Sequence, residues 1–279
     1  MEPVDEKMAK DLKGKSRDAF DAQAATYDAD MHGSHARSLY PHVIDEVKRA
    51  VEGIDSPRLL DLGCGTGALA EALLEEVANA CLACVDLSPK MLELAKERLA
   101  GRADISLVDV EGLPFSDSSF DAAWCNDSFH HYPDPKKAAF QMWRVLKPGG
   151  TLVVGDVWQP APARAIMNAW MPYSNEGDVR IYSESEMCAI LGTWFNDVQW
   201  RRIGTTSCLA VARKLGARAL RHRLDDQLRP PRSLDPHRLL PSGRRSLRHC
   251  RHAALVDLDV GHVALTVGCV MPAHQERAV

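Results

Sequence analysis

The sequence predicts a doubly wound α/β fold built on a seven-stranded, mostly parallel sheet. Short apolar segments typical of buried strands alternate with segments whose apolar residues recur at helical spacing, and this alternation favours a parallel sheet covered on both faces. A glycine cluster at residues 63–67 separates the first strand from the helix that follows it. Strand, glycine turn and helix in this order are typical of α/β domains that bind nucleotides.

The chain up to residue 155 supplies five of the predicted strands, at residues 58–62, 81–87, 105–108, 120–125 and 151–155. One helix is predicted before the first strand, at residues 39–51. Between the strands, helices are predicted at residues 89–99 and 135–146, with one more that carries Leu69, Leu73, Leu74 and Val77 on one face. Ser88 before Pro89 and Asp134 before Pro135 each place an N-cap residue ahead of a proline at the first helical position. Two helix starts are therefore well defined.

The elements after residue 155 complete the sheet. A helix is predicted at residues 161–171, and Ser183 with Glu186 forms a capping box that starts a helix running toward Leu191. The last two strands, at residues 198–203 and 208–212, are separated by a short turn, which predicts an antiparallel hairpin at the sheet edge. Seven strands are complete by about residue 214.

Composition divides the chain near residue 214. All 17 aromatic residues lie at or before Trp200, and residues 215–279 contain 11 Arg and no Lys. A stretch rich in Arg, Pro and His and without aromatic side chains has little with which to offset the entropy lost on ordering. We therefore predict an N-terminal helical cap over residues 1–52, a ligand-binding α/β domain over 53–214, and a tail over 215–279 that is disordered or a non-native extension.

Charge and cysteine content bound the partners and the location. The net charge of −4 indicates no polyanion partner, so no nucleic acid is predicted to bind. The N-terminus lacks the pattern of a secretory signal, and the most apolar run contains Asp257 and Asp259, so no membrane span is predicted. Eight scattered cysteines fit a reducing cytoplasm. The C-x-x-C of Cys81 and Cys84 lies in an apolar run typical of a buried strand, and no second pair completes a zinc site.

The residues at the strand ends predict an adenosine-containing ligand. Gly63, Gly65 and Gly67 allow a tight turn and close approach of a ligand to the backbone. Asp86 follows Gly67 by 19 residues and ends the second strand, where a carboxylate accepts hydrogen bonds from ribose hydroxyls. Asp109 ends the third strand in the same way. The glycine pattern alone fits a nicotinamide dinucleotide as well as other adenosine-containing cofactors.

Taken together and in this order, several segments resemble the class I S-adenosylmethionine methyltransferases, in the branch that includes the ubiquinone and menaquinone biosynthesis enzymes (methyltransferase domain type 11). These segments are residues 59–67, Asp86 with Leu87, Asp109, 113–120 and 146–150. Phe20, Asp21, Tyr27 and Asp28 look like the N-terminal signature of that branch, and the tail after Lys214 has no counterpart. The resemblance implies an enzyme that transfers a methyl group from S-adenosylmethionine, the implied cofactor, to a small-molecule acceptor.

The resemblance also implies a role for each cofactor residue. Asp61 and the glycine loop hold the methionine part, Asp86 binds the ribose, and Leu87 offers an apolar edge to the adenine. Asp109 and the backbone of Val110 bind the adenine amino edge. Tyr27 covers the cofactor from the N-terminal side, and Asn126 lies beside the sulfonium.

The acceptor side is expected near two histidines. A sulfonium is a good leaving group, so the chemistry needs mainly in-line placement of the acceptor, and a general base adds typically 10²- to 10⁴-fold. His130 and His131 follow Asn126 closely and are the candidate catalytic residues, although the pair also fits a polar loop in which at least one is only structural. His32 and His35 are expected at the solvated surface.

A lid over the acceptor is expected from the N-terminal segment and residues 158–182, with Trp170, Tyr173 and Tyr182 as its aromatic walls. An NAD(P)-binding oxidoreductase would not require Asp109, and a non-catalytic S-adenosylmethionine-binding protein would have lost the cofactor acids. Asn126 is not followed by the Pro-Pro-Tyr of enzymes that methylate nucleic-acid bases. Asp127 and Asp156 belong to no evident ligand triad, and no metal is predicted.

Overall fold

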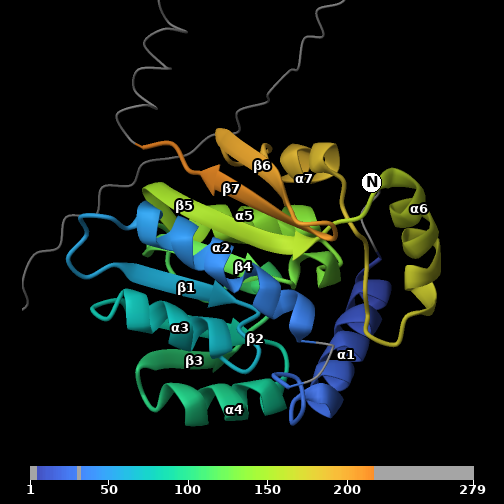
Figure 1. Cartoon of the computed structure of the whole chain (residues 1–279), viewed down its shortest axis with the longest axis horizontal. Helices are drawn as coiled ribbons and strands as arrows, with labels where there is room; N and C mark the ends of the chain where they lie inside the picture. The colour runs from blue at the N-terminus through green and yellow to red at the C-terminus, as the bar shows by residue number, and fades with distance from the viewer. Residues whose placement is uncertain (1–4, 30–32, 217–279) are drawn as a thin grey trace, which may run out of the picture. The chain divides into compact units, whose positions relative to one another are not determined.

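The computed structural model describes residues 5–29 and 33–216, whose arrangement is drawn in Figure 1. The seven strands form one sheet in the order β3-β2-β1-β4-β5-β7-β6. Pairing is parallel from β3 to β5, while β7 runs antiparallel to β5 and to β6. The strands are β1 (Arg58–Leu62), β2 (Cys81–Asp86), β3 (Ala103–Leu107), β4 (Phe120–Asn126), β5 (Leu146–Val157), β6 (Asp197–Ile203) and β7 (Ser207–Arg213). The predicted fold class and the terminal hairpin are confirmed.

Helices cover both faces of the sheet (Figure 1). They are α1 (Glu6–Gln23), α2 (Ser34–Ala50), α3 (Ala68–Glu76), α4 (Pro89–Leu99), α5 (Pro135–Val145), α6 (Ala161–Trp170) and α7 (Glu184–Leu191), with short 3₁₀ turns η1 (Val110–Gly112), η2 (Phe129–His131) and η3 (Met171–Tyr173). The predicted caps are present, because Ser88 Oγ accepts from the Met91 N–H and Asp134 Oδ1 from the Lys137 N–H. Ser183 and Glu186 form the predicted capping box.

The core has two layers that follow the alternation of side chains along the strands. On one face Leu60, Leu62 and Cys125 are buried together with residues of α5 and α7. On the other face Leu59 and Trp124 are buried together with residues of α2 and α3. β1 and β4 lie at the centre of the sheet, and for this reason both of their faces are buried. Because they are parallel, their carboxyl ends lie at the same edge of the sheet.

The N-terminal region adds two helices with different roles. α2 buries Val43 and Val47 against the sheet. α1 is strongly polar and buries only Ser16, so its apolar period gave no clear signal in the sequence. It lies beside the carboxyl ends of the central strands (Figure 1). α1 therefore covers the edge at which β1, β2 and β4 end.

Three further sequence predictions concern exposure and span. In β2, Cys84 is buried, whereas Cys81, the first residue of the strand, is exposed. Over residues 5–29 and 33–216, no helix has the length and apolar character needed to cross a bilayer. The predicted tail and its apolar run lie outside the described residues from position 217 onward.

Candidate functional site

The glycine loop after β1 is built for close contact with a ligand. The N–H groups of Gly63 and Cys64 both donate to the carbonyl of Val85, at 2.8 and 3.0 Å, which ties the loop to the end of β2. Gly63, Gly65 and Gly67 all have positive φ, a conformation that favours glycine. A Cβ on Gly63 would lie 2.7 Å from Ser128 Oγ, whereas one on Gly67 would press on Ala95 of α4. Gly67 thus allows α3 to pack closely against α4, and Gly63 allows close approach of Ser128. Gly63 and Gly65 also line the main pocket.

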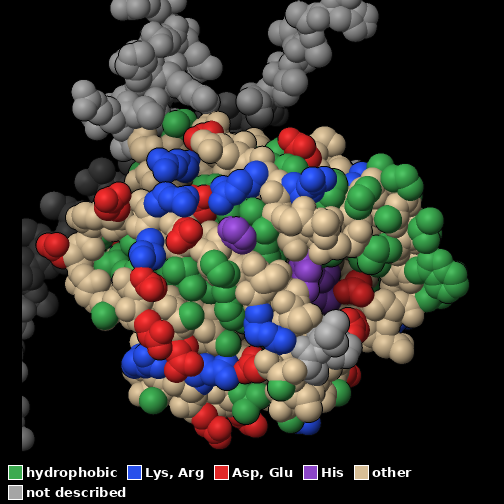
Figure 2. Space-filling model, in the orientation of Figure 1, with side chains coloured by type: hydrophobic (Ala, Val, Ile, Leu, Met, Phe, Trp, Pro, Cys, Tyr) green, Lys and Arg blue, Asp and Glu red, His purple; other side chains and the backbone are tan. Residues whose placement is uncertain are grey.

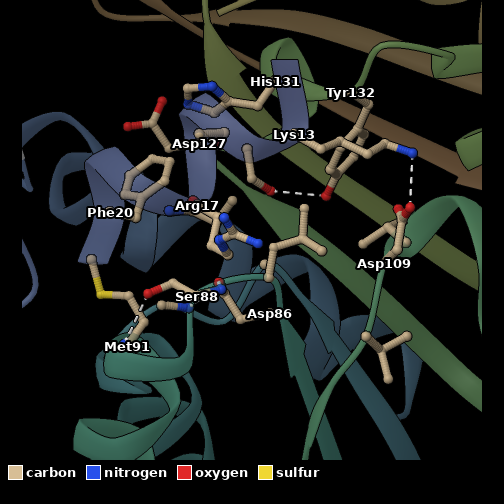
Figure 3. A pocket seen from close by; sticks show the side chains of 18 of the residues that line it. Lys13, Arg17, Phe20, Asp86, Ser88, Met91, Asp109, Asp127, His131 and Tyr132 are labelled. Carbon is tan, nitrogen blue, oxygen red and sulfur yellow. Dashed lines mark hydrogen bonds and ion pairs between the residues drawn. The ribbon is translucent and has the colours of Figure 1, made fainter. Parts of the chain in front are cut away.

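The main pocket lies between this loop, the ends of β2 and β4, and α1 (Figure 3). It encloses about 750 Å³, part of which is open to solvent. Leu87, Met91, Val108 and Val110 give it an apolar wall, with Asp86 and Asp109 at its polar positions. This combination of an apolar slot and two carboxylates suits a flat heterocycle joined to a polyhydroxylated group.

Asp86 is held rigidly by the loops that it connects. Its Oδ2 accepts from the Gly65 N–H at 2.9 Å, and its Oδ1 accepts from the Ser88 N–H at 2.8 Å. Burial raises the pKa of the carboxyl, while these backbone donors act in the opposite direction. Each carboxylate oxygen can accept a further hydrogen bond, so Asp86 remains able to bind a hydroxyl in the pocket.

Asp109 is paired with a residue of α1 that the sequence analysis did not identify. Lys13 Nζ lies 2.7 Å from Asp109 Oδ2 and 2.6 Å from Glu111 Oε2. Burial acts to lower the pKa of Lys13, but the two carboxylates outweigh it and raise the pKa. α1 also places Arg17 and Phe20 along the pocket (Figure 3). No local sequence signal marks these residues, because they reach the site only through the packing of α1.

A smaller inner pocket of about 330 Å³ lies deeper, beside Asp61. Asp61 Oδ2 and Asn126 Oδ1 are buried here, and neither has a hydrogen-bond partner among the described residues. Burial raises the pKa of Asp61 well above its usual value, although the Trp124 indole acts against it. A buried acceptor without a donor is costly, so Asp61 Oδ2 indicates that a ligand with N–H groups belongs beside it. Asn126 Oδ1 instead packs toward Gly155 of β5.

The N-terminal signature residues connect α1 to this site. Asp21 Oδ1 accepts from Ser88 Oγ and from the Lys90 N–H at the start of α4. Asp28 accepts from Thr66 Oγ1 in the glycine loop and pairs with Arg98 of α4. Tyr27 lines both the main and the inner pocket. Asp21 and Asp28 therefore attach the N-terminal segment, which covers the site, to the glycine loop and α4. Tyr27 contacts both pockets.

The two candidate histidines have different environments. His130 Nδ1 lies 2.5 Å from Oδ1 of Asp156, a residue of β5 that is 1% exposed. Burial lowers the pKa of His130, but the Asp156 carboxylate outweighs it and raises the pKa to about 9. Burial and the neighbouring His130 lower the pKa of His131 well below its usual value. His130 is therefore the charged member of the pair at neutral pH, and His131 is neutral.

A third space, which we call the histidine pocket, opens beside the main pocket. It encloses about 320 Å³, and its lining is Phe20, Gln23, Tyr27, Asp127, His130, His131 and Glu176. Phe20, Tyr27, Asp127 and His131 line the main pocket as well, so the two spaces share a wall. The site as a whole therefore has an apolar end, a deep polar end and a histidine-lined side.

Comparison with known proteins agrees with this geometry. Residues 60–154 match the family model described as "Methyltransferase domain". Demethylmenaquinone methyltransferase of Clavibacter sepedonicus is 39% identical over 40% of this chain and 46% of that protein. 27-O-demethylrifamycin SV methyltransferase of Amycolatopsis mediterranei is 40% identical over 38% of this chain and 41% of that protein. The chain thus matches less than half the length of each of these two relatives.

Solved structures share the fold of this chain. A S-adenosylmethionine-dependent methyltransferase of Thermotoga maritima, described as a possible histamine N-methyltransferase, has a TM-score of 0.56 at 20% identity, covering 71% of this chain and 99% of that one. The YcgJ protein of Bacillus subtilis has a TM-score of 0.53 at 20% identity, covering 63% and 100% of the two chains. Identity this low establishes the fold alone.

The domain also holds Asp127 in a strained and well-supported position. Asp127 has a φ of 56°, unusual for a residue with a side chain, and its N–H donates to the Gly155 carbonyl at 2.7 Å. His35 Nδ1 lies 2.8 Å from Asp127 Oδ1, and His35 Nε2 lies 2.8 Å from Ser207 Oγ. His35 is thus a partner of a site residue rather than a solvated surface residue, which corrects the sequence-based expectation. His32 lies outside the described residues.

The predicted lid is only partly present. Trp170 and Tyr173 are 70% and 79% exposed, on the apolar surface of α6 and η3 that Figure 2 shows in green at one end of the molecule. Tyr182 is buried in the core against the ring of Phe129. The expected aromatic walls are therefore wrong. The segment contributes Glu176 and Asp178 instead, because the chain turns inward after η3.

Two side-chain groups in the described residues bring metal-binding atoms within 4.8 Å of one another: His130, His131 and Asp178, and Asp127, His130 and Asp156. These triads were not evident from the sequence. In the second group, His130 and Asp156 are already joined by the 2.5 Å contact, which is closer than the roughly 3 Å between two ligands of one ion with bonds of about 2.1 Å. That pair is a hydrogen bond.

Proposed function

We propose that this chain is an S-adenosylmethionine-dependent methyltransferase that transfers the methyl group to a small-molecule acceptor. The observation that carries the proposal is the buried Asp61 Oδ2, without a partner among the described residues, in an inner pocket that adjoins the carboxylate-lined main pocket. Gly63, Gly65 and Asn126 line both pockets, so one elongated ligand can span them. The family match over residues 60–154 supports the same conclusion.

We assign the cofactor residues along this path. Asp109 and the backbone of Val110 bind the adenine edge, with Leu87 as an apolar neighbour, and Asp86 binds the ribose. Asp61 and the loop with Gly63 and Gly65 hold the methionine part, and Tyr27 covers it. Gly67 serves by packing α3 against α4. The residues present therefore fit the cofactor at its apolar, hydroxylated and cationic parts.

We place the acceptor on the side of the histidine pocket, beside Asn126 and Asp127. When bound, the cofactor supplies a methyl group attached to a positively charged sulfur, and this sulfur is a good leaving group. His130, oriented by Asp156, takes the proton that the acceptor gives up. Because its pKa is raised to about 9, it acts as a base only in the fraction of molecules in which it is neutral, and this fraction grows as the pH rises toward 9. His131 stays neutral and offers a hydrogen bond to the acceptor. Both histidines therefore act on the acceptor.

The acceptor and the location follow from charge and thiol chemistry. Asp127 and Glu176 line the histidine pocket, and carboxylates there would repel nucleic-acid phosphates, which favours a small molecule over a nucleic acid. All six described cysteines are free thiols, which fits our proposal of a cytoplasmic enzyme.

Calorimetry tests the cofactor assignment directly. We expect S-adenosylhomocysteine to bind and NAD and NADP not to bind. Asp86→Ala removes hydrogen bonds to the ribose, so S-adenosylhomocysteine binding should weaken by about 1.5 to 3 kcal/mol. Asp104→Ala, at an exposed position of β3, is the matched control and should leave the affinity unchanged.

Thermal unfolding of each variant separates lost binding from lost folding, because Asp86 also accepts from the glycine-loop backbone. Binding of NAD without binding of S-adenosylhomocysteine would refute the proposed function. An unchanged affinity in a folded Asp86→Ala variant would remove Asp86 from the site.

A further inference from the structure

The histidine pocket is lined by acidic side chains and by no basic side chain other than its two histidines, among the described residues. Asp127 and Glu176 line it, and none of the described residues that line it is Lys or Arg. The Arg37 guanidinium donates to the Tyr27 carbonyl and is not part of the lining. The rings of Phe20 and Tyr27 form the remaining wall, and their faces carry partial negative charge. The pocket therefore presents carboxylates and aromatic rings together.

A buried atom in this pocket has no partner. His131 Nδ1 is buried without a hydrogen bond among the described residues, and only 9% of the side chain is exposed. Asp178 Oδ1 lies 3.3 Å from this atom and 3.8 Å from His130 Nε2. These separations leave the carboxylate between two imidazoles without a close bond to either. Asp178 already accepts from Ser174 Oγ through its Oδ2 at 2.8 Å, so His131 Nδ1 is the atom that a ligand in the pocket would satisfy.

The charges of the surrounding residues do not cancel. Among the described residues, Asp127 lines the pocket, and Asp156 and Asp178 contact the histidines that line it. The close imidazole partners are His35 for Asp127 and His130 for Asp156. His131 is kept neutral by burial and by its charged neighbour. Even with His35 and His130 both protonated, one negative charge stays uncompensated in this set. A positively charged ligand would supply the balance, whereas a neutral or anionic one would not.

We propose that the methyl acceptor is an organic amine that enters the histidine pocket as a cation, beside the carboxylate of Asp127 and the rings of Phe20 and Tyr27. This inference rests on the proposed function and adds the chemical class of the acceptor. Carboxylates provide charge-assisted hydrogen bonds to an ammonium group, and aromatic faces provide cation–π attraction. The wall shared with the main pocket brings the amine next to Asn126 and Asp127, where the methyl group is transferred.

The transfer balances with groups already at the site. The bound ammonium gives one N–H proton to Nε2 of neutral His130, whose Nδ1–H stays bonded to Asp156. The freed nitrogen lone pair forms the new C–N bond as the S–CH₃ bond breaks, and that electron pair stays on sulfur as the neutral thioether. The product is a methylated ammonium. One positive charge passes from sulfur to the acceptor side, where the carboxylates stabilise it.

The test compares a cation with its neutral isostere on the full chain saturated with S-adenosylhomocysteine. 2-Dimethylaminoethanol, which is protonated near neutral pH, and 3-methyl-1-butanol have the same shape and differ in charge. Ligand-observed NMR titration should give at least about a tenfold preference for the amine. Asp127→Asn should reduce this preference, and Glu176→Gln, from a different segment of the chain, should reduce it independently. Glu52→Gln, at an exposed position that lines none of these pockets, should leave the preference unchanged.

Each outcome separates this inference from the proposed function. Failure of S-adenosylhomocysteine to bind would refute the proposed function itself. Binding of S-adenosylhomocysteine with equal affinity for the amine and the alcohol would overturn the amine inference alone. A pocket that binds Zn²⁺ in a parallel titration and shows no preference for the amine would also overturn it and would assign the His130, His131 and Asp178 group to a metal. Loss of preference in the Asp127→Asn and Glu176→Gln variants, with cofactor affinity retained, would support it.

Discussion

Pairs of residues from distant elements set the charge around the histidine pocket. His130 and His131 are neighbours in the chain, yet the pKa of His130 is raised to about 9 by Asp156 and that of His131 is lowered by burial and by His130. His35 and Asp127 form a second pair, joined across 92 positions of the sequence. A residue type alone therefore does not give its protonation state, because the partner decides it.

The charge of His130 gives a testable pH dependence. Its folded pKa of about 9 lies above the ordinary value near 6.5, so protonation stabilises the fold. This contribution is complete below about pH 6.5 and is lost as the pH rises through about 9. Histidine NMR titration should show His130 protonated at pH 7, with a lower pKa in Asp156→Asn and no change in the exposed control Asp104→Asn. A His130 resonance that titrates near 6.5 in the unaltered protein would contradict the charged pair.

At the scale of elements, α1 is attached to the site mainly by polar contacts. It is attached to the main pocket by Lys13 and to α4 by Asp21, through contacts at its surface rather than through a buried apolar face. Gly177, in the loop after η3, allows that loop to approach α1 closely, since a Cβ on Gly177 would lie 2.5 Å from the Leu12 carbonyl oxygen. Elements held mainly by polar surface contacts open at low free-energy cost, so α1 is suited to admit and release the cofactor.

Removing the Lys13 contact should loosen this cover without unfolding the domain. The Lys13–Asp109 pair is partly exposed and contributes about 0 to 1 kcal/mol, but Glu111 is buried and loses its charge partner. Lys13→Met should therefore lower the thermal midpoint without abolishing cooperative unfolding. It should accelerate amide hydrogen exchange in α1 and the release of S-adenosylhomocysteine in stopped-flow experiments. Lys10→Met, an exposed change on the same helix, is the control. Identical release rates for the two variants would show that Lys13 does not hold the cover.

At the scale of the whole molecule, β7 is the last strand among the described residues and completes the sheet. β7 inserts between β5 and β6, and Lys214 follows it to donate from Nζ to the carbonyls of Trp143 and Leu146. The backbone of Lys214 also pairs with Gly149 and Gly150. The hydrogen bonds of the final strand and the C-terminus of α5 are thus satisfied by residues up to Lys214.

A chain ended after Gly216 should therefore fold and bind cofactor. We expect a single cooperative unfolding transition and an S-adenosylhomocysteine affinity within about twofold of the full chain, because no residue of the described pockets lies beyond Trp200 apart from Arg202. Calorimetry and circular dichroism on the shortened chain provide the measurement. Loss of the cooperative transition would show that the tail contributes to the fold.

Local patterns in the sequence determined the order of strands and helices, the caps at Ser88, Asp134 and Ser183, and the glycine turn. They also predicted that Asp86 and Asp109 lie at one site, because parallel strands place their carboxyl ends at the same edge. Tertiary structure alone decided that Lys13 reaches Asp109, that His35 supports Asp127, and that Trp170 and Tyr173 face solvent. These contacts join residues far apart in the chain, and hydrophobic periodicity specifies which face of an element is buried but not which distant polar side chain it meets.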